Sequence, residues 1–190
     1  KFIAAAVHNP AVADQTQRLL DQRDGLILGI CNGFQALIKL GLLPYGTISD
    51  LSEDSPTLTF NRIGRHASCY VTTRVLNNHS PWLRFTSPGD LHAIPVSHGE
   101  GRFAASAVLI RQLAEQGQIA TQYVGPDGCP SGLTAYNPNA SAAAIEGITS
   151  PDGRIFGKMG HSERQGPLLA RNVPGEKDQR IFAAGVSYFT

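Results

Sequence analysis

The sequence contains few charged and few sulfur-containing residues, and each scarcity excludes a class of protein. Charged residues make up 16% of the 190 residues and the formal net charge is +1, which argues against a nucleic-acid or membrane surface built on bulk charge. No apolar run approaches the roughly 20 residues that a membrane-spanning helix needs. The three cysteines, Cys31, Cys69 and Cys129, are odd in number and far apart, so we expect no disulfide framework and a reducing, cytoplasmic setting.

Methionine occurs only at position 159, so Lys1 is not a translation start. Residues 1–10 also lack the long apolar segment of a secretory signal. We therefore expect the chain to be a cleavage product or a piece of a longer protein. Its length corresponds to one domain, or a large part of one, with enough residues for a substantial core.

The chain is organised around residues 25–40, which read GLILGICNGFQALIKL. The apolar run at residues 26–30 is typical of a strand buried on both faces. After Cys31 the apolar residues recur at helical spacing, and Gly41 provides a C-terminal stop. The pattern predicts a strand that runs into a helix with almost no loop, with Cys31 at the junction.

Gly29 and Gly33 flank Cys31 and produce Gly-x-Cys-x-Gly, the thiol version of the nucleophile elbow. Small flanking residues permit the sharp, strained turn that lifts the side chain clear of the sheet. At a helix N-terminus we expect the thiolate to be favoured over the thiol. The alternative is a core residue, because cysteine is among the most buried residue types.

The remaining patterns predict an α/β mixture with inserted antiparallel hairpins. Helices are expected over residues 1–9, 12–22 and 104–116. Strands are expected within residues 58–76, 91–96, 118–124, 142–148, 154–159 and 185–189. Turns or loops are expected at residues 41–46, 125–139 and 150–153, and the last of these joins two strands as a hairpin.

A nucleophilic cysteine needs a base, and the base needs an orienting group on its other ring nitrogen. His161 and Glu163 follow an expected strand and a glycine. In extended backbone, residues two apart face the same side, so this carboxylate is able to orient the imidazole. Histidine and glutamate are also common at strand ends, so the pair taken alone fits an ordinary surface pair as well.

The motifs GICNGFQ at residues 29–35 and HSER at residues 161–164 resemble the class I (triad) glutamine amidotransferases, whose pattern is Gly-x-Cys-x-Gly-x-Gln followed by His-x-Glu. The longer segments at residues 1–10, 29–44, 97–103 and 135–164 resemble the glutaminase domain of phosphoribosylformylglycinamidine synthase, the fourth enzyme of purine biosynthesis. This resemblance covers nearly the whole chain.

The resemblance implies an open, mostly parallel sheet with helices on both faces, a flavodoxin-like α/β fold that lacks its first strands. It implies one glutamine amidotransferase domain over residues 1–190 that is incomplete at its N-terminus. It further implies the C-terminal domain of the large single-chain form of the enzyme, with the synthetase part upstream. The Gly-Gly loop that supplies half of the family's oxyanion hole does not precede Lys1, so we expect the chain to be incomplete as a catalyst.

The resemblance also assigns the catalytic roles. Cys31 would attack the side-chain amide of L-glutamine, form a γ-glutamyl thioester and release ammonia. His161 would take the thiol proton, protonate the leaving ammonia and activate the hydrolytic water, and Glu163 would orient His161.

The glutamine site carries over in the same way. The backbone N–H of Asn32 would form half of the oxyanion hole. Gln35 occupies the family's glutamine-site position, one helical turn beyond the nucleophile. Ser97, Gly99 and Glu100 belong to the loop that, in related amidotransferases, holds the α-amino and carboxylate groups of the substrate.

His98 lies in the same loop and is a candidate second base, although a structural, hydrogen-bonded histidine is the preferred interpretation. No metal site is expected, because the six histidines are scattered and neither Cys69 nor Cys129 has a partner at ligand spacing. The resemblance assigns ATP and Mg²⁺ to the upstream synthetase part, and this chain is expected to hold no cofactor.

Two other functions remain open. A cysteine hydrolase or peptidase of similar α/β design would keep the elbow, but it would explain neither Gln35 nor the loop at residues 97–101. A catalytically silent docking or regulatory domain would not need Cys31, His161 and Glu163 to be intact together.

Overall fold

The computed structural model describes residue 7 and residues 9–190, so most of the helix expected over residues 1–9 lies outside the described residues. A six-stranded sheet has the order β1-β8-β7-β6-β3-β4. Its strands are β1 (Ile27–Ile30), β3 (Ala67–Val75), β4 (Leu91–His98), β6 (Ile119–Val124), β7 (Ile145–Thr149) and β8 (Ile155–Lys158). A second sheet pairs β2 (Thr57–Phe60) with β5 (Glu100–Ala104).

The α/β class is confirmed, but the expected mostly parallel sheet is corrected to a mixed one. Among the described strands of the large sheet, β1 and β8 run parallel, whereas the other four neighbouring pairs run antiparallel. Short connections explain the difference, because a tight turn such as the one between β7 and β8 can join only antiparallel neighbours. The hairpin expected around residues 150–153 is confirmed.

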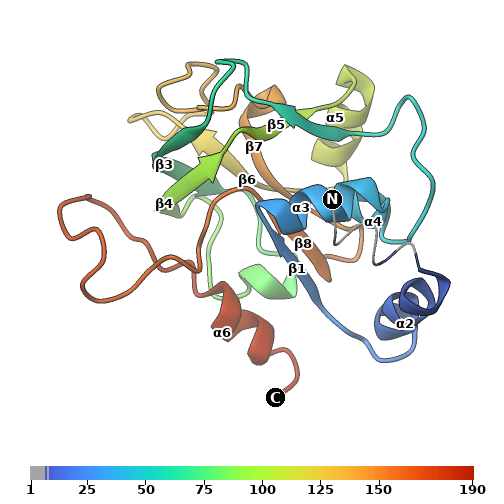
Figure 1. Cartoon of the computed structure of the whole chain (residues 1–190). Helices are drawn as coiled ribbons and strands as arrows, with labels where there is room; N and C mark the ends of the chain where they lie inside the picture. Colours follow the sequence, from blue (N-terminus) through green and yellow to red (C-terminus); the bar gives the residue numbers. More distant parts are fainter. Residues whose placement is uncertain (1–6, 8) are drawn as a thin grey trace.

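Helices cover both faces of the sheet, as expected (Figure 1). One hydrophobic cluster combines residues of α2 (Pro10–Asp21), α3 (Asn32–Lys39), α4 (Leu42–Tyr45) and α5 (Ala107–Glu115) with the sheet. A second cluster joins the sheet to α6 (Ile181–Val186) and to the 3₁₀ turn η1 (Pro81–Leu83). The neighbours Ile155 and Phe156 enter different clusters, so the sheet is buried on both sides.

Two local predictions were wrong. Residues 185–189, expected as a strand, belong in part to α6, because Gly185 packs directly against the ring of Trp82 from η1. Residues 41–46, expected as a turn, contain the short helix α4 between Gly41 and Gly46, both of which have a positive φ. Tertiary packing and glycine geometry therefore override the local pattern.

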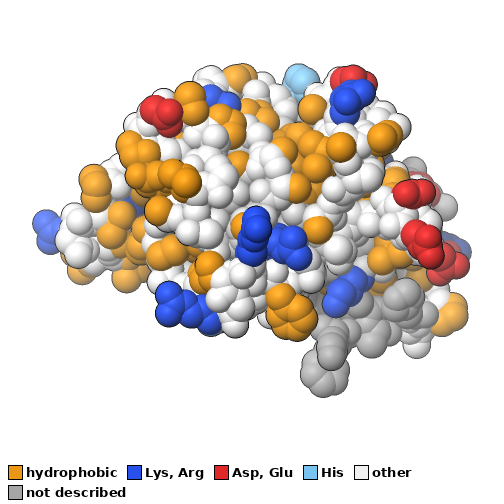
Figure 2. All heavy atoms as spheres, turned by 90° about the horizontal axis from the view of Figure 1, so that it is seen from above, with side chains coloured by type: hydrophobic (Ala, Val, Ile, Leu, Met, Phe, Trp, Pro, Cys, Tyr) orange, Lys and Arg blue, Asp and Glu red, His pale blue; other side chains and the backbone are white. Residues whose placement is uncertain are grey.

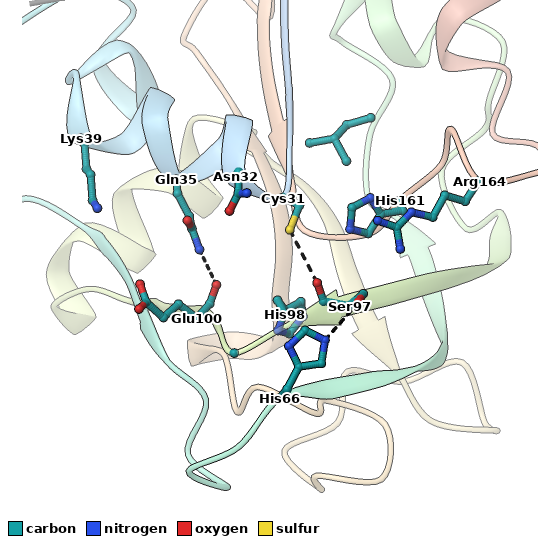
Figure 3. Close-up of a pocket in the computed structure, with 12 residues that line it drawn as sticks. Cys31, Asn32, Gln35, Lys39, His66, Ser97, His98, Glu100, His161 and Arg164 are labelled. Atoms are coloured by element: carbon teal, nitrogen blue, oxygen red, sulfur yellow. Dashed lines mark hydrogen bonds between the residues drawn. The ribbon is translucent and has the colours of Figure 1, made fainter. Parts of the chain in front are cut away.

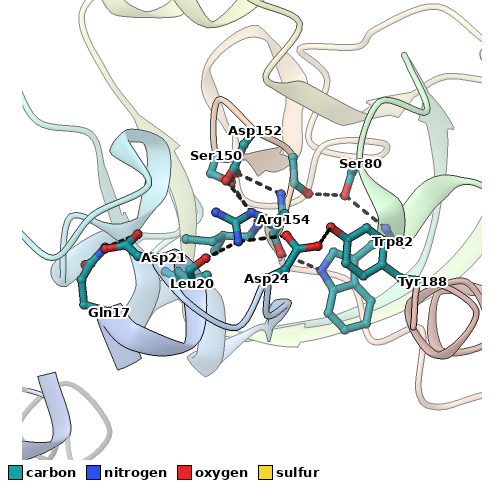
Figure 4. Close-up of polar contacts among 12 residues, drawn as sticks. Gln17, Leu20, Asp21, Asp24, Ser80, Trp82, Ser150, Asp152, Arg154 and Tyr188 are labelled. Carbon is teal, nitrogen blue, oxygen red and sulfur yellow. Dashed lines mark hydrogen bonds and ion pairs between the residues drawn. The ribbon is translucent and has the colours of Figure 1, made fainter. Parts of the chain in front are cut away.

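A polar cluster ties the amino end of β8 to the connection between α2 and β1 and to the C-terminal segment (Figure 4). The Arg154 guanidinium pairs with Asp152 at 2.7 Å and with Asp24 at 3.3 Å, and it also donates to the carbonyl oxygen of Leu20. The Tyr188 hydroxyl donates to Asp24 at 2.7 Å. This cluster lies at the opposite end of β8 from Lys158, the residue that leads to the candidate site. None of the described helices is long and apolar enough to cross a membrane.

Candidate active site

Cys31 lies where β1 ends and α3 begins, with φ 54° and ψ −106°. A positive φ is uncommon for a residue with a side chain, so the backbone is strained at this junction. The Cys31 N–H donates to the carbonyl oxygen of Lys158 at 2.8 Å, and its carbonyl oxygen accepts the N–H of Gln35 at 3.1 Å. The strand before the cysteine and the helix after it hold the strained turn, which is the predicted elbow.

The two flanking glycines have different roles. A Cβ atom on Gly29 would lie 2.5 Å from Leu37 Cδ1 and 2.7 Å from the carbonyl carbon of Gly33, so the strand approaches the helix too closely for a side chain. A Cβ atom on Gly33 would have no described atom within 4 Å. Of the two flanking glycines, only Gly29 has a steric reason to be glycine.

His161 follows β8, and its backbone N–H donates to the carbonyl oxygen of Pro95 in β4 at 2.8 Å. Its Nδ1 lies 2.5 Å from Glu163 Oε1. Because a carboxylate accepts, the ring proton is on Nδ1 and Nε2 is free to accept a proton. Nε2 is buried and has no hydrogen-bond partner among the described residues. The expected contact between residues 161 and 163 is therefore present.

Cys31 and His161 open into one pocket of about 550 Å³ (Figure 3). The parallel pair β1 and β8 explains the meeting, because both residues follow the carboxyl ends of neighbouring strands. The pocket is lined by Ile30, Cys31, Asn32, Gln35, Lys39, His66, Ser97, His98, Gly99, Glu100, His161 and Arg164. All five residues expected to bind glutamine are in this set, whereas Glu163 is not among the lining residues.

The thiol of Cys31 is directed at the carbonyl oxygen of Ser97, 3.9 Å away. Burial raises the pKa of this thiol, whereas the N–H of Asn32 and the charge of Arg164 lower it, and the charge of Glu163 raises it again. The net shift is upward, so the expectation that the helix N-terminus alone favours the thiolate is corrected. Cys31 rests as a thiol, and any reaction as a nucleophile needs a base to remove its proton.

The wall opposite α3 comes from β4, β5 and the segment before β3. Gln35 Nε2 donates to the carbonyl oxygen of Glu100 at 2.5 Å, which links α3 to this wall. Ser97 Oγ lies 3.0 Å from His66 Nε2. The hydrogen bond of Gln35 therefore joins the α3 side of the pocket to the opposite wall, and the contact of Ser97 with His66 holds that wall together.

Four lining residues were not predicted from sequence, namely Ile30, Lys39, His66 and Arg164. The position of Lys39, four residues after Gln35, is a signal that helical spacing would have supplied. The position of Arg164, next to Glu163, is a second signal. His66 has no local signal, because the antiparallel register of β3 and β4 alone brings it beside Ser97.

His98 has a structural role in this pocket. Its Nδ1 lies 3.1 Å from Asn61 Oδ1, and burial lowers its pKa to about 4. The ring is therefore neutral near pH 7 and its Nδ1 is already engaged. The preferred interpretation of His98 as a hydrogen-bonded structural histidine agrees with this geometry. Among the described residues, no group of three or more His, Cys, Asp or Glu side chains is placed to hold a metal ion.

A cysteine elbow and a His–Glu pair around one pocket of an α/β sheet form the arrangement of a glutamine amidotransferase. The family model of the CobB/CobQ-like glutamine amidotransferase domain matches residues 1–189, and the chain belongs to this family. The sequence resemblance to the amidotransferase of phosphoribosylformylglycinamidine synthase is confirmed by the relatives described next.

Three similar proteins are informative. Phosphoribosylformylglycinamidine synthase subunit PurQ of Symbiobacterium thermophilum is 37% identical over 169 residues, which cover 88% of this chain and 65% of that protein. The subunit of the same name from Gloeobacter violaceus is 33% identical over 174 residues, which cover 91% of this chain and 68% of that protein. A chain in the structure of PurLQS from Thermotoga maritima matches with 26% sequence identity and a TM-score of 0.70. The match covers 98% of this chain and 72% of that chain. The chain thus spans about two thirds of the length of its curated relatives.

Proposed function

We propose that this chain is the glutamine-hydrolysing part of phosphoribosylformylglycinamidine synthase. It releases ammonia from L-glutamine, and a synthetase part uses the ammonia with ATP to make formylglycinamidine ribonucleotide in purine biosynthesis. The observation that carries the proposal is the 2.5 Å contact between His161 Nδ1 and Glu163 Oε1, with Nε2 free and the Cys31 thiol on the same pocket.

The proposed reaction follows from these atoms. His161 Nε2 takes the proton of Cys31, and the sulfur attacks the amide carbon of the glutamine side chain. The carbonyl oxygen becomes an oxyanion, which accepts the N–H of Asn32. The proton on His161 passes to the leaving nitrogen, which departs as ammonia and leaves a γ-glutamyl thioester. His161 then takes a proton from water, and the hydroxide cleaves the thioester to glutamate and thiol.

The raised pKa of Cys31 makes the His–Glu pair essential to this scheme. A thiol that rests protonated reacts only when a base is within reach, and the carboxylate of Glu163 stabilises the imidazolium that forms. The pocket volume of about 550 Å³ suits a small amino acid. Ser97, Gly99 and Glu100 would hold the α-amino and carboxylate groups of the substrate, and Gln35 would line the same glutamine site.

The partner of this chain is a synthetase that binds ATP and Mg²⁺. The resemblance favours a synthetase on the same polypeptide. The named relatives are subunits, and the solved relative is a PurLQS structure, so a separate subunit is the other arrangement. Mass spectrometry of the purified native protein distinguishes the two, because a chain that includes the synthetase is far heavier than a separate glutaminase subunit.

An electrophilic glutamine analogue tests the catalytic assignment. We expect a diazoketone analogue of glutamine to modify Cys31 in the full-length protein and to leave Cys69 and Cys129 unmodified, although both of these are exposed and free. Peptide mass spectrometry provides the readout, and excess glutamine should protect Cys31. Modification of Cys69 and Cys129 with Cys31 untouched would disprove a glutamine-binding thiol site and support the docking-domain alternative.

A further inference from the structure

A buried ion pair lies directly behind the proposed active site. Lys158 Nζ is 3.4 Å from Glu146 Oε1, and both side chains are 0% exposed. Removing two charges from water costs more than their attraction usually returns, so such a pair is weak evidence of stabilisation. Burial lowers the pKa of Lys158, and the carboxylate of Glu146 opposes this shift. The pair therefore needs another explanation.

Each charge of the pair is bound to the backbone or side chains of the segment after β8. Glu146 Oε1 accepts the N–H of Gly160 at 2.6 Å, and Oε2 accepts the hydroxyl of Thr121 at 2.5 Å. Lys158 Nζ donates to the carbonyl oxygen of Gly160 at 3.2 Å and to Ser162 Oγ at 2.7 Å. Gly160 and Ser162 are the two neighbours of His161 in the chain, so the ion pair forms hydrogen bonds on both sides of that residue.

The same lysine reaches the other side of the site through its backbone. Its carbonyl oxygen accepts the N–H of Cys31 at 2.8 Å. Lys158 thus contacts the residue that carries the thiol and, through Ser162, the residue next to the imidazole. The Ser162 hydroxyl donates onward to Gln179 Oε1 at 2.5 Å, which links the network to the segment before α6.

We propose that Glu146, Lys158 and Ser162 form a positioning network that holds the imidazole of His161 in reach of the Cys31 thiol. This proposal rests on the proposed function and extends it to residues that do not line the pocket. The network holds His161 through Gly160 and Ser162, while Glu163 orients the ring and Pro95 holds the backbone. A displacement of about 1 Å at a reacting group can lower the rate about 100-fold, so the proposed reaction depends on His161 being held in a fixed position.

The test compares four variants of the full-length protein with one another, each assayed in the presence of its synthetase part. Lys158→Met removes the charge and keeps the length of the side chain, and Ser162→Ala removes only the hydroxyl. Arg154→Met is the matched control, because it breaks an ion pair at the opposite end of β8 (Figure 4). His161→Asn defines the rate without the base. Glutaminase kcat and KM are measured for each variant, together with the rate of Cys31 alkylation by iodoacetamide at pH 7.

We expect Ser162→Ala and Lys158→Met to lower kcat about 10- to 100-fold while KM stays within about threefold, and Arg154→Met to keep both values. We also expect both network variants to alkylate Cys31 nearly as slowly as His161→Asn. Should Lys158→Met fail to fold, Ser162→Ala alone decides the matter, because it introduces no uncompensated carboxylate. A wild-type kcat and alkylation rate in folded Ser162→Ala would overturn the proposal.

The alkylation rate separates this inference from the proposed function. Suppose that the wild-type protein does not hydrolyse glutamine, but that its Cys31 is alkylated fast and the Cys31 of Ser162→Ala and of His161→Asn is alkylated slowly. The positioning network then stands and the glutaminase assignment fails. If glutamine is hydrolysed and Ser162→Ala behaves as wild type, the network fails and the glutaminase assignment stands.

Discussion

At the scale of single residues, two opposite effects act on the Cys31 thiol. Its burial raises the pKa, and the neighbouring N–H of Asn32 and the charge of Arg164 only partly offset this. A protonated thiol is a poor nucleophile until a base removes its proton. In the proposed reaction, His161, whose Nδ1 contacts Glu163, removes this proton.

Glu163→Gln tests the orienting role of the carboxylate. Glutamine keeps the size and a hydrogen-bonding oxygen but loses the charge that stabilises the imidazolium. We expect kcat for glutamine hydrolysis to fall about 10- to 100-fold while KM changes little. Steady-state kinetics of the full-length protein provide the measurement. An unchanged kcat would remove Glu163 from the proposed triad.

His98 predicts a dependence of stability on pH. Its pKa is lowered from 6.5 to about 4 by burial, so the unfolded state binds a proton more readily between these values. The contribution of the neutral, buried His98 to stability is therefore fully present above pH 6.5 and is lost as the pH falls toward 4. The shift corresponds to a loss of about 3 kcal/mol in the free energy of unfolding.

Urea unfolding at pH 7 and at pH 4.5 measures this loss, and His98→Gln is the comparison because it keeps an amide able to bond Asn61. We expect the variant to lose less stability on acidification than the wild-type protein. Equal losses in the two proteins would show that another group, such as the buried His92, causes the acid sensitivity.

At the scale of elements, the site depends on the contact between β1 and α3. Leu37 of the helix fills the space above Gly29 of the strand, so the turn at Cys31 has no room to relax. β8 lies beside β1 in parallel and presents His161 beyond its end. The geometry of the site is thus a property of three neighbouring elements, each of which holds the next.

Gly29→Ala is predicted to destabilise the protein by about 1–3 kcal/mol, because the new methyl group would overlap Leu37 and the backbone of Gly33. Gly33→Ala is the matched control. It adds the same methyl group inside α3 where no described atom lies within 4 Å, and alanine favours a helix over glycine by about 0.5–1 kcal/mol. Thermal unfolding of the two variants should therefore shift in opposite directions. A similar loss in both would refute the steric argument.

At the scale of the whole molecule, the proposed function divides the labour between two active sites. In this proposal the described pocket releases ammonia, and the synthetase part uses it. If the two sites are coupled, a ligand bound at the synthetase site changes the affinity of the other site for glutamine, and glutamine changes the affinity for that ligand by the same factor. We therefore expect occupation of the synthetase site to alter glutamine hydrolysis. The chain's match to subunits of an assembled synthase is consistent with this arrangement.

Cys31→Ala is predicted to abolish glutamine-dependent synthesis in the parent enzyme and to leave ammonia-dependent synthesis at its original rate. The physical reason is that free ammonia enters the synthetase site without the thioester step. Product formation is assayed with glutamine and with an ammonium salt as alternative nitrogen sources. A parallel loss of both activities would contradict the division of labour.

Part of the fold was predictable because it depends on neighbours in the chain. The elbow at Cys31, the β7–β8 hairpin and the helix after residue 106 all follow from patterns that span fewer than about 15 residues. The strand directions were not predictable in this way, and the strand expected over residues 185–189 was wrong. In both cases the outcome depends on residues far apart in sequence, such as Trp82 against Gly185.

The sequence by itself determined the nucleophile elbow and the His–Glu pair, because short motifs with defined spacing carry them. The family resemblance implied the five further residues that line the same pocket. Only the tertiary structure decided the protonation of Cys31, since the pKa of a thiol depends on burial by distant segments. It alone brought His66 to Ser97, 31 residues further along the chain. This contact arises from strand pairing over a long separation, which no local pattern encodes.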